Sequence, residues 1–297
     1  MRVAFVTTAD AASVHDDVDI AIQRDAFARA GHELLEWPWE DRSLDWSAPD
    51  LIVIRSPWNW TSDVVGFGAW LDRVESPRLH NPAPVVRWNL DKRYLADLAA
   101  HGVSVVPTHY VRDPADVTPT LASFASGEVV VKPTVSAGSR LTGRFAADDV
   151  AAEALARAIL AEGNEVMIQP HLEAVARDGE VGVVCIDGVI SHAFVKGPIL
   201  APGGGFVSGA YEERITPHAL SNDEREVVDA ALGAVDAILR VRALSDGSPL
   251  LYCRIDLVRL DDGGVAVLEL EAFEPCLFLP VDPDAGDRFV RAVEARL

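Results

Sequence analysis

The sequence is poor in cysteine, and the arrangement of its few cysteines excludes two kinds of architecture. Cys185, Cys253 and Cys276 are the only cysteines among the 297 residues. Their number is odd and none lies in a Cys-x-x-Cys pair, which argues against a disulfide framework and against a zinc site. All three lie in apolar surroundings, so we predict that they are small core residues.

Positive charge is also scarce. The chain has 26 Lys and Arg against 46 Asp and Glu, a formal net charge of −20. Nucleic-acid duplexes and anionic membrane surfaces bind basic footprints, so we expect no nucleic-acid and no membrane partner. A small anionic ligand such as a nucleotide stays compatible with this composition, because a few local cations can hold it.

Long hydrophobic runs are missing, although 49% of the residues are hydrophobic. No run of about 18 apolar residues occurs, and the N-terminal stretch MRVAFVTTAD has no apolar segment followed by a cleavage site. We therefore expect a soluble, cytoplasmic protein with a core large enough for about two or three packed units.

The first 83 residues predict an open, mostly parallel sheet. Apolar runs and amphipathic segments follow one another in the order β-α-β-β-α. Strands are predicted over 1–8, 32–39 and 51–55, and helices over 17–31 and 61–74, the second with Ser62 as N-cap. Ligands of such sheets bind beyond the carboxyl ends of the strands. The stretch RSPWNW, residues 55–60, occupies such an end.

Two further units are predicted after a hinge at NPAP, residues 81–84. Residues 84–165 predict a small α/β lobe, with helices over 88–102, 114–125 and 148–163 and strands over 105–111 and 128–132. Residues 166–297 predict a third lobe, with strands over 166–170, 180–186 and 189–196, a helix over 223–239, two more strands and a last helix. The fold class is thus α/β, with α+β lobes.

An acidic hairpin is predicted over residues 251–275, LYCRIDLVRLDDGGVAVLELEAFEP. If its DDGG turn closes symmetrically, Asp256 faces Glu269, Arg254 faces Glu271, and all four side chains share one face. Directly opposed carboxylates are destabilising without a cation between them, and hard oxygen ligands suit Mg²⁺ or Mn²⁺. The alternative is a solvated face with Arg254–Glu271 as a surface ion pair. A slip of one residue would remove the argument.

Three lysines and two flexible stretches are candidates for binding phosphate. Lys92, Lys132 and Lys196 lie at predicted helix or strand ends, although a single lysine is more often a solvated surface residue. The loop TVSAGSRLTG, 134–143, lies between a predicted strand and a predicted helix and could direct backbone N–H groups at phosphates. PILAPGGGF, 198–206, could form a lid or simply a hairpin tip.

In this order, and across nearly the whole chain, these segments resemble the ATP-grasp ligase superfamily. The resemblance implies an N-terminal substrate domain over 1–83, a nucleotide-binding lobe over 84–165 and a lobe with the metal site over 166–297. It implies Asp256 and Glu269 as Mg²⁺ ligands. Glu271 stands where the family more often has Asn, as a third metal ligand. Arg254 matches the basic residue that polarises the acyl carbonyl.

The resemblance also implies an ATP site. Its residues are Lys92, Lys132 and Lys196 at the phosphates, Ser136, Ala137, Gly138 and Ser139 in the loop over the γ-phosphate, Gln169, Pro170, His171 and Leu172 in the hinge at adenine, and Glu180 at the ribose. Gln169 replaces a common acidic residue of the family. Lys196, Ser139 and Arg254 are the implied catalytic residues.

The implied reaction is that of an ADP-forming carbon–nitrogen ligase. ATP activates a carboxylate as an acyl phosphate, and a nitrogen nucleophile then attacks it. RSPWNW, VVRWNLDKRYL, VVKPTVSAGSR, SHAFVKGP and ELEAFEPCLFL are most similar to a glutathione-synthetase-like subgroup. That subgroup includes the cyclo-ligase that forms cycloserine from O-ureidoserine, so we expect ring closure of O-ureido-D-serine in antibiotic biosynthesis. The alternatives are an intermolecular ligase of amino acids and a non-catalytic nucleotide-binding protein.

RSPWNW then becomes part of the expected site for an amino-acid-like small molecule. Arg55 would clamp a carboxylate, Ser56 and Asn59 would bond a polar head group, and Trp58 and Trp60 would form a rigid wall. The alternative is that both tryptophans are core residues and that Arg55 pairs with an acid. Oligomeric state stays open, with a homo-oligomer among the alternatives.

Overall fold

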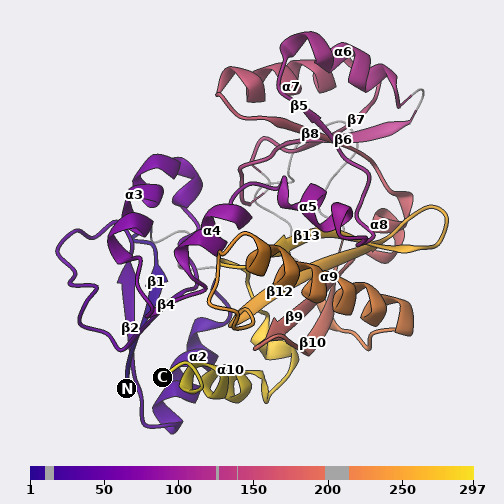
Figure 1. Cartoon of the computed structure of the whole chain (residues 1–297). Helices are drawn as coiled ribbons and strands as arrows, with labels where there is room; N and C mark the ends of the chain where they lie inside the picture. Colours follow the sequence, from indigo (N-terminus) through magenta and orange to yellow (C-terminus); the bar gives the residue numbers. More distant parts are fainter. Residues whose placement is uncertain (11–16, 125–126, 139, 198–213) are drawn as a thin grey trace.

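The computed structural model describes residues 1–10, 17–124, 127–138, 140–197 and 214–297, and places them in three lobes with one sheet each (Figure 1). The N-terminal sheet is parallel, with strand order β2-β1-β3-β4. Its strands are β1 (Arg2–Thr7), β2 (Glu33–Pro38), β3 (Leu51–Ile54) and β4 (Leu79–His80). The predicted open parallel sheet is confirmed.

The helices of this lobe begin slightly later than predicted. They are α2 (Ile20–Arg29), the 3₁₀ turn η1 (Trp60–Ser62) and α3 (Val64–Val74). The N-cap of α3 is Asp63, whose carboxylate accepts a 2.8 Å hydrogen bond from the Gly66 N–H. The prediction of Ser62 as N-cap is wrong, because Ser62 closes η1 and its hydroxyl donates to the Asn59 carbonyl.

The helix predicted over 88–102 is interrupted. The structure has α4 (Ala83–Asn89) and α5 (Tyr94–Ala100), with Lys92 in the break between them. The Lys92 N–H donates to the Thr134 carbonyl at 2.9 Å, so this break is anchored to the loop of the next lobe. The interruption brings a lysine to the point where the lobes meet.

The predicted hinge is firmly tied to the C-terminal sheet. Asn81 is 1% exposed, and its amide donates to the carbonyls of Tyr252 and Ala272. Its side-chain oxygen accepts from the Leu251 N–H at 2.8 Å. All hydrogen-bonding groups of this buried amide are thereby used, and residue 81 fixes the two lobes to each other.

The central lobe has an antiparallel sheet of order β5-β8-β6-β7. Its elements are β5 (His109–Val111), α6 (Pro114–Ala122), β6 (Glu128–Pro133), β7 (Gly143–Ala146), α7 (Val150–Ala161) and β8 (Val166–Pro170). Because β8 pairs with β5 and β6, this sheet extends to Pro170, beyond the boundary predicted at residue 165. The loop after β6 leads to strand β7, not to a helix as predicted.

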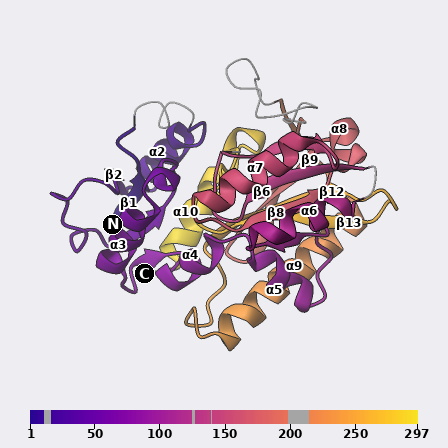
Figure 2. The same cartoon turned by 90° about the horizontal axis from the view of Figure 1, so that it is seen from above.

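The C-terminal sheet is antiparallel, with order β11-β10-β9-β12-β13. Its lobe contains α8 (Glu173–Asp178), β9 (Glu180–Ile186), β10 (Val189–Lys196), β11 (Ile215–Pro217), α9 (Asn222–Val241), β12 (Tyr252–Arg259), β13 (Val265–Glu271), η2 (Leu279–Val281) and α10 (Ala285–Glu294). Seen from above, the central lobe overlies this sheet and the N-terminal lobe lies beside both (Figure 2).

The two ends of the chain share one core. The ring of Phe5 on β1 contacts Phe27 on α2 and Phe289 on α10, with centroids 5.3 and 6.1 Å apart. Helices α2 and α10 lie side by side (Figure 1). The last helix therefore belongs structurally to the N-terminal lobe as much as to the C-terminal one. None of the described helices combines the length and apolarity needed to cross a membrane.

Candidate active site

A cavity of about 620 Å³ lies where the three lobes meet. This volume is in the range of small-molecule sites, about 300–1,000 Å³. Most of the site residues predicted from the sequence line it: Trp58, Lys92, Lys132, Ser136, Ala137, Gly138, Gln169, Pro170, His171, Leu172, Glu180, Lys196, Arg254, Asp256, Glu269 and Glu271. Arg55, Ser56 and Asn59 do not line it. Ser139 and the predicted lid over 198–206 lie outside the described residues.

The hairpin β12–β13 has the predicted register at the cavity. Arg254 pairs with Glu271 and Asp256 with Glu269. Nearer the turn, however, Leu257 pairs with Val267, so Leu268 is an extra residue in a β-bulge. The assumption of a symmetric turn is therefore wrong by one residue close to the turn. The bulge restores the register that brings both carboxylates to the same place.

Side chains of α4 and α5 fix the outer strand of this hairpin. The Asn89 amide donates to the Leu270 carbonyl at 2.8 Å, and its oxygen accepts from the Ala272 N–H at 2.7 Å. The Leu270 N–H donates to the Tyr94 hydroxyl at 2.9 Å. These bonds satisfy backbone N–H and C=O groups on the outer edge of β13. They thereby hold Glu269 and Glu271 in position. Sequence analysis missed Asn89 and Tyr94, although both flank Lys92 in NLDKRYL.

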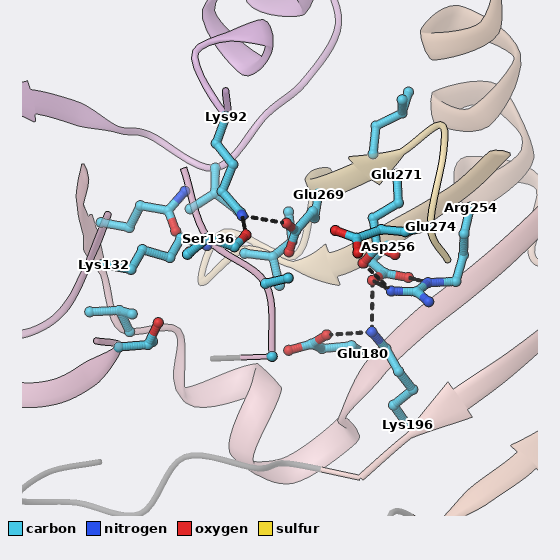
Figure 3. A pocket seen from close by; sticks show the side chains of 18 of the residues that line it. Lys92, Lys132, Ser136, Glu180, Lys196, Arg254, Asp256, Glu269, Glu271 and Glu274 are labelled. Atoms are coloured by element: carbon cyan, nitrogen blue, oxygen red, sulfur yellow. Dashed lines mark hydrogen bonds and ion pairs between the residues drawn. The ribbon is translucent and has the colours of Figure 1, made fainter. Parts of the chain in front are cut away.

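Arg254 and Lys196 converge on the buried carboxylate of Asp256 (Figure 3). Arg254 donates through Nε and Nη2 to the two oxygens at 2.8 and 2.9 Å, and Lys196 Nζ donates at 2.7 Å. Burial acts to raise the pKa of Asp256, but these two cations outweigh it and hold the pKa at about 2. Arg254 and Asp256 are 7% and 2% exposed, which excludes the alternative of a solvated sheet face.

Lys196 also pairs with Glu180 from the neighbouring strand, with Nζ and Oε2 3.1 Å apart. Gly179 makes this approach possible. Its φ is +77°, and a Cβ there would lie 2.2 Å from the Lys196 carbonyl oxygen. A side chain at residue 179 would thus push β9 away from β10 and separate the pair.

Lys92 and Lys132 approach the hairpin from the side opposite to Lys196 (Figure 3). Lys92 Nζ lies 3.1 Å from Glu269 Oε1 and donates to the Ser136 carbonyl at 2.5 Å. Lys132 is 9% exposed, and none of the described residues forms an ion pair with it. Burial lowers the pKa of Lys132, although Glu269 opposes the shift. Lys132 is therefore a buried cation that an anionic ligand would complete.

The three predicted metal ligands differ in ionisation. Burial favours a raised pKa for Glu269, yet Lys92 and Lys132 lower it. Burial raises the pKa of Glu271 to about 7, against the effect of its partner Arg254. Within the described part of the chain, no three His, Cys, Asp or Glu side chains form a ready-made metal site. The carboxylates have the hard oxygens that Mg²⁺ prefers, but they contact cations here, which must move aside for a metal.

The predicted adenine segment lies at the end of β8. Gln169 is buried and its amide donates to the Thr108 hydroxyl at 2.9 Å. The His171 N–H donates to the Glu128 carbonyl, whereas its ring Nε2 is buried and has no partner among the described residues. Burial lowers the pKa of His171. All four residues of the segment, 169–172, line the cavity.

The stretch RSPWNW contributes only its tryptophans to the cavity. Trp58 Nε1 donates to the Glu274 carbonyl at 2.9 Å. Trp60 is 1% exposed and packs against Phe273, and it lines the cavity as well as the core. Both tryptophans therefore line the cavity, and Trp60 also belongs to the hydrophobic core.

Arg55 belongs to a different cluster. Its side chain is 1% exposed, with Nη2 3.4 Å from Asp19 Oδ2 and Nη1 donating to the Pro275 carbonyl. This geometry supports the alternative that Arg55 pairs with an acid, not the predicted clamp on a substrate carboxylate. Ser56 is buried and continues the hydrogen bonding to β1, and the Asn59 amide is used by Trp39 and Glu40.

Glu274 and Cys276 are two further cavity residues that sequence analysis missed. Glu274 lines the cavity and is 8% exposed. The only signal for Glu274 in the sequence is that it follows the two acids of ELE by three residues. Cys276 is half-buried and lines the cavity too, so the prediction that all three cysteines are core residues is wrong for Cys276 and confirmed for Cys185 and Cys253.

Comparisons with known proteins show which proteins the chain is similar to. Residues 3–81 match the family model "D-cycloserine synthetase DcsG, N-terminal domain". The cycloserine biosynthesis protein DcsG of Streptomyces lavendulae is 40% identical over 296 residues, covering 97% of each chain. A crystal structure of D-cycloserine synthetase DcsG superposes with a TM-score of 0.90 at 37% identity, over the full length of both chains.

A more distant neighbour shares the fold. The ATP-grasp ligase PsnB, solved with a minimal precursor, Mg and ADP, has a TM-score of 0.62 at 20% identity and covers 98% of each chain. The predicted ATP-grasp fold is thereby confirmed.

Proposed function

Because the chain belongs to the family of the D-cycloserine synthetase DcsG, a family of ATP-grasp ligases, we propose that it uses ATP to close O-ureido-D-serine to D-cycloserine. The observation that carries the proposal is the convergence of Lys92, Lys132, Lys196 and Arg254 on the hairpin carboxylates in one cavity. The end-to-end match with DcsG supports the choice of substrate. D-Cycloserine formation would place the protein in antibiotic biosynthesis.

The cations would hold the polyphosphate of ATP. Lys132 has no ion-pair partner among the described residues that it would have to give up, and Lys92 would exchange Glu269 for phosphate oxygens. Phosphoryl transfer spreads negative charge over the transferred group, so fixed cations stabilise the transition state. Gln169 to Leu172 would contact adenine, Glu180 the ribose, and residues 136–139 the γ-phosphate.

Asp256, Glu269 and Glu271 would hold Mg²⁺, which would neutralise charge on the phosphates during transfer. The loss of the ion pairs to Lys92 and Lys196 would be offset once these lysines bind phosphate instead. Glu271, with its raised pKa, would become fully ionised in such a site.

The substrate carboxylate would take the γ-phosphoryl group to give an acyl phosphate and ADP. The nitrogen bonded to the side-chain oxygen of the same molecule would attack the acyl carbon and expel phosphate. Arg254 would stabilise the oxyanion of that step. Cycloserine lacks the carbamoyl group of the ureido nitrogen, so water must remove this group as carbamate. Nucleophile and acyl group share one small molecule, which favours ring closure by proximity.

The test is product analysis by mass spectrometry with MgATP and O-ureido-D-serine, beside the L enantiomer. We expect ADP and D-cycloserine in equal amounts from the wild type and neither from Glu269→Gln. Glu173→Gln, an exposed acid at the start of α8, is the matched control and should retain full activity. ADP release only after a second amino acid is added would show an intermolecular ligase. Nucleotide binding without ADP release would show a non-catalytic binding protein.

A further inference from the structure

Glu274 is a buried carboxyl that forms no ion pair with any described lysine, arginine or histidine. The other four acids of the cavity each have a cation: Lys92 pairs with Glu269, Lys196 with Glu180 and Asp256, and Arg254 with Asp256 and Glu271. Glu274 is 8% exposed, and its Oε2 has no hydrogen-bond partner among the described residues. Burying a carboxylate without a partner is costly, so this position indicates a missing cation.

The main chain around Glu274 is fixed by other residues. Trp58 Nε1 donates to the Glu274 carbonyl at 2.9 Å, Arg55 to the Pro275 carbonyl at 3.2 Å and Arg254 to the Cys276 carbonyl at 3.0 Å. The guanidinium groups of Arg55 and Arg254 therefore bond the backbone of this segment and form no ion pair with the Glu274 carboxyl. These three bonds to main-chain carbonyls do not involve the Glu274 side chain.

The carboxyl lines the same cavity as the hairpin carboxylates and lies close enough to Glu271 to be affected by its charge (Figure 3). Burial raises the pKa of Glu274 well above its usual range, and Glu271 raises it further, while Trp60 and Lys92 oppose the shift only in part. A cation brought in by a ligand would reverse this effect and would bind in surroundings walled by Trp58 and Trp60. Charge-assisted hydrogen bonds are strongest in such a water-poor environment.

We propose that Glu274 binds the α-ammonium group of the amino-acid substrate and so selects amino acids over other ureidooxy acids. The inference rests on the proposed function, since O-ureido-D-serine carries one ammonium group beside the carboxylate that reacts. An ammonium group offers three N–H donors and the positive charge that this carboxyl lacks. Anchoring it fixes the orientation of the carboxylate that must reach the γ-phosphate.

The test compares two substrates in three proteins. The second substrate is 3-(ureidooxy)propanoate, which has the same chain without the α-amino group. We expect wild type to prefer O-ureido-D-serine in kcat/KM by about 100-fold or more, because a buried polar group rejects an analogue that leaves it unpaired. Glu274→Gln should lower this preference to less than about tenfold, mainly by raising KM for the amino substrate. Its rate with the analogue should stay close to that of wild type.

Glu274→Asp keeps the charge on a shorter side chain and should retain a preference between those of wild type and Glu274→Gln. It also provides the comparison if Glu274→Gln does not fold. An unchanged preference in an active variant would overturn the role of Glu274. Absence of turnover in wild type would instead refute the proposed function, and with it the inference.

Discussion

Two buried clusters of charge lie close to the segment 274–279, and they differ in how completely their members are satisfied. In the Asp19 cluster, formed by Asp19 and Arg55, Asp19 is 0% exposed and accepts from the N–H groups of Leu277 and Leu279 at 2.6 and 2.7 Å. Arg55 provides its counter-charge and also packs over the Tyr252 ring. In the cavity, by contrast, Lys132 and Glu274 have no ionic partner among the described residues.

The difference separates a structural from a functional role for buried charge. In the Asp19 cluster the two opposite charges pair with each other and with main-chain groups, which holds the fold together, although Arg55 Nε has no hydrogen-bond partner among the described residues. A buried charge without a partner destabilises the ligand-free protein and is completed on binding. Arg55 and Lys132 are both basic residues at strand ends, but Arg55 has the structural role and Lys132 the functional one.

The largest effect is expected from breaking the Asp19 cluster. Asp19→Asn leaves Arg55 buried without a counter-charge, which should lower the free energy of unfolding by about 3–5 kcal/mol. The measurement is the thermal melting temperature, together with KM for ATP in the folded fraction. We expect a large fall in melting temperature and an unchanged KM. A stable variant with impaired substrate binding would place Asp19 in the active site instead.

Lys132→Met is the matched change in the cavity. Because a charge-assisted hydrogen bond to phosphate contributes about 1.5–3 kcal/mol, kcat/KM for ATP should fall by about 10- to 100-fold. The melting temperature should stay the same or rise, since the variant removes a buried unpaired charge. Steady-state kinetics and melting curves of the same preparation check both parts. A large loss of stability would show that Lys132 has a structural role like that of Arg55.

Asn89→Ala should affect both stability and function. The Asn89 amide forms buried hydrogen bonds, and these bonds position β13, which carries the proposed metal ligands Glu269 and Glu271. It leaves the Leu270 C=O and the Ala272 N–H without their partner, at a cost of about 1–3 kcal/mol. We expect both a lower melting temperature and a lower kcat, from displacement of Glu269 and Glu271. Asn89→Asp keeps the acceptor for Ala272 but places a buried carboxylate oxygen against the Leu270 carbonyl, so it should lose at least as much. Normal kcat in Asn89→Ala would mean that β13 holds its position without Asn89.

The smallest effect concerns pH. Burial lowers the pKa of His192, whose ring contacts the Leu277 carbonyl next to the Asp19 cluster, while this bond and Asp282 oppose the shift. His192 is then protonated more easily in the unfolded chain than in the folded one. Its contribution to the free energy of unfolding is therefore fully present above about pH 6.5 and is lost as pH falls below this value. The loss is at most about 1.4 kcal/mol per pH unit. Melting curves from pH 8 to 5 should show this loss, and His192→Gln should flatten it. Equal slopes in both proteins would contradict the assignment.

Local patterns in the sequence predict most of the site. Strand alternation places Arg254, Asp256, Glu269 and Glu271 on one face, and the lysines lie where apolar strands or helices end. Such periodicities depend on neighbours in sequence, so they can be read without the fold. The register was predicted from a turn centred between Asp262 and Gly263, whereas the strand pairs next to the turn are centred on Asp262. Only the bulge at Leu268 makes the predicted pairs Asp256–Glu269 and Arg254–Glu271 correct.

Contacts between distant residues could not be predicted in this way. Asp19 meets Leu277 across 258 residues, and this contact determines that Arg55 faces Asp19 and not a substrate. Likewise, whether Glu274 has an ion-pair partner among the described residues depends on where Arg55 and Arg254 point. Whether a buried charge is satisfied is a property of the packed fold, whereas its position at a strand end is a property of the sequence.

The most direct test of the account is a crystal structure with Mg²⁺, a non-hydrolysable ATP analogue and O-ureido-D-serine. We predict that Lys132 Nζ bonds a phosphate oxygen, that Glu269 binds Mg²⁺ and that Glu274 contacts the substrate ammonium group. Asp19 and Arg55 should keep the contacts that they have without ligand. A complex in which Lys132 and Glu274 stay unpaired, or in which Arg55 leaves Asp19 for the substrate, would contradict the account.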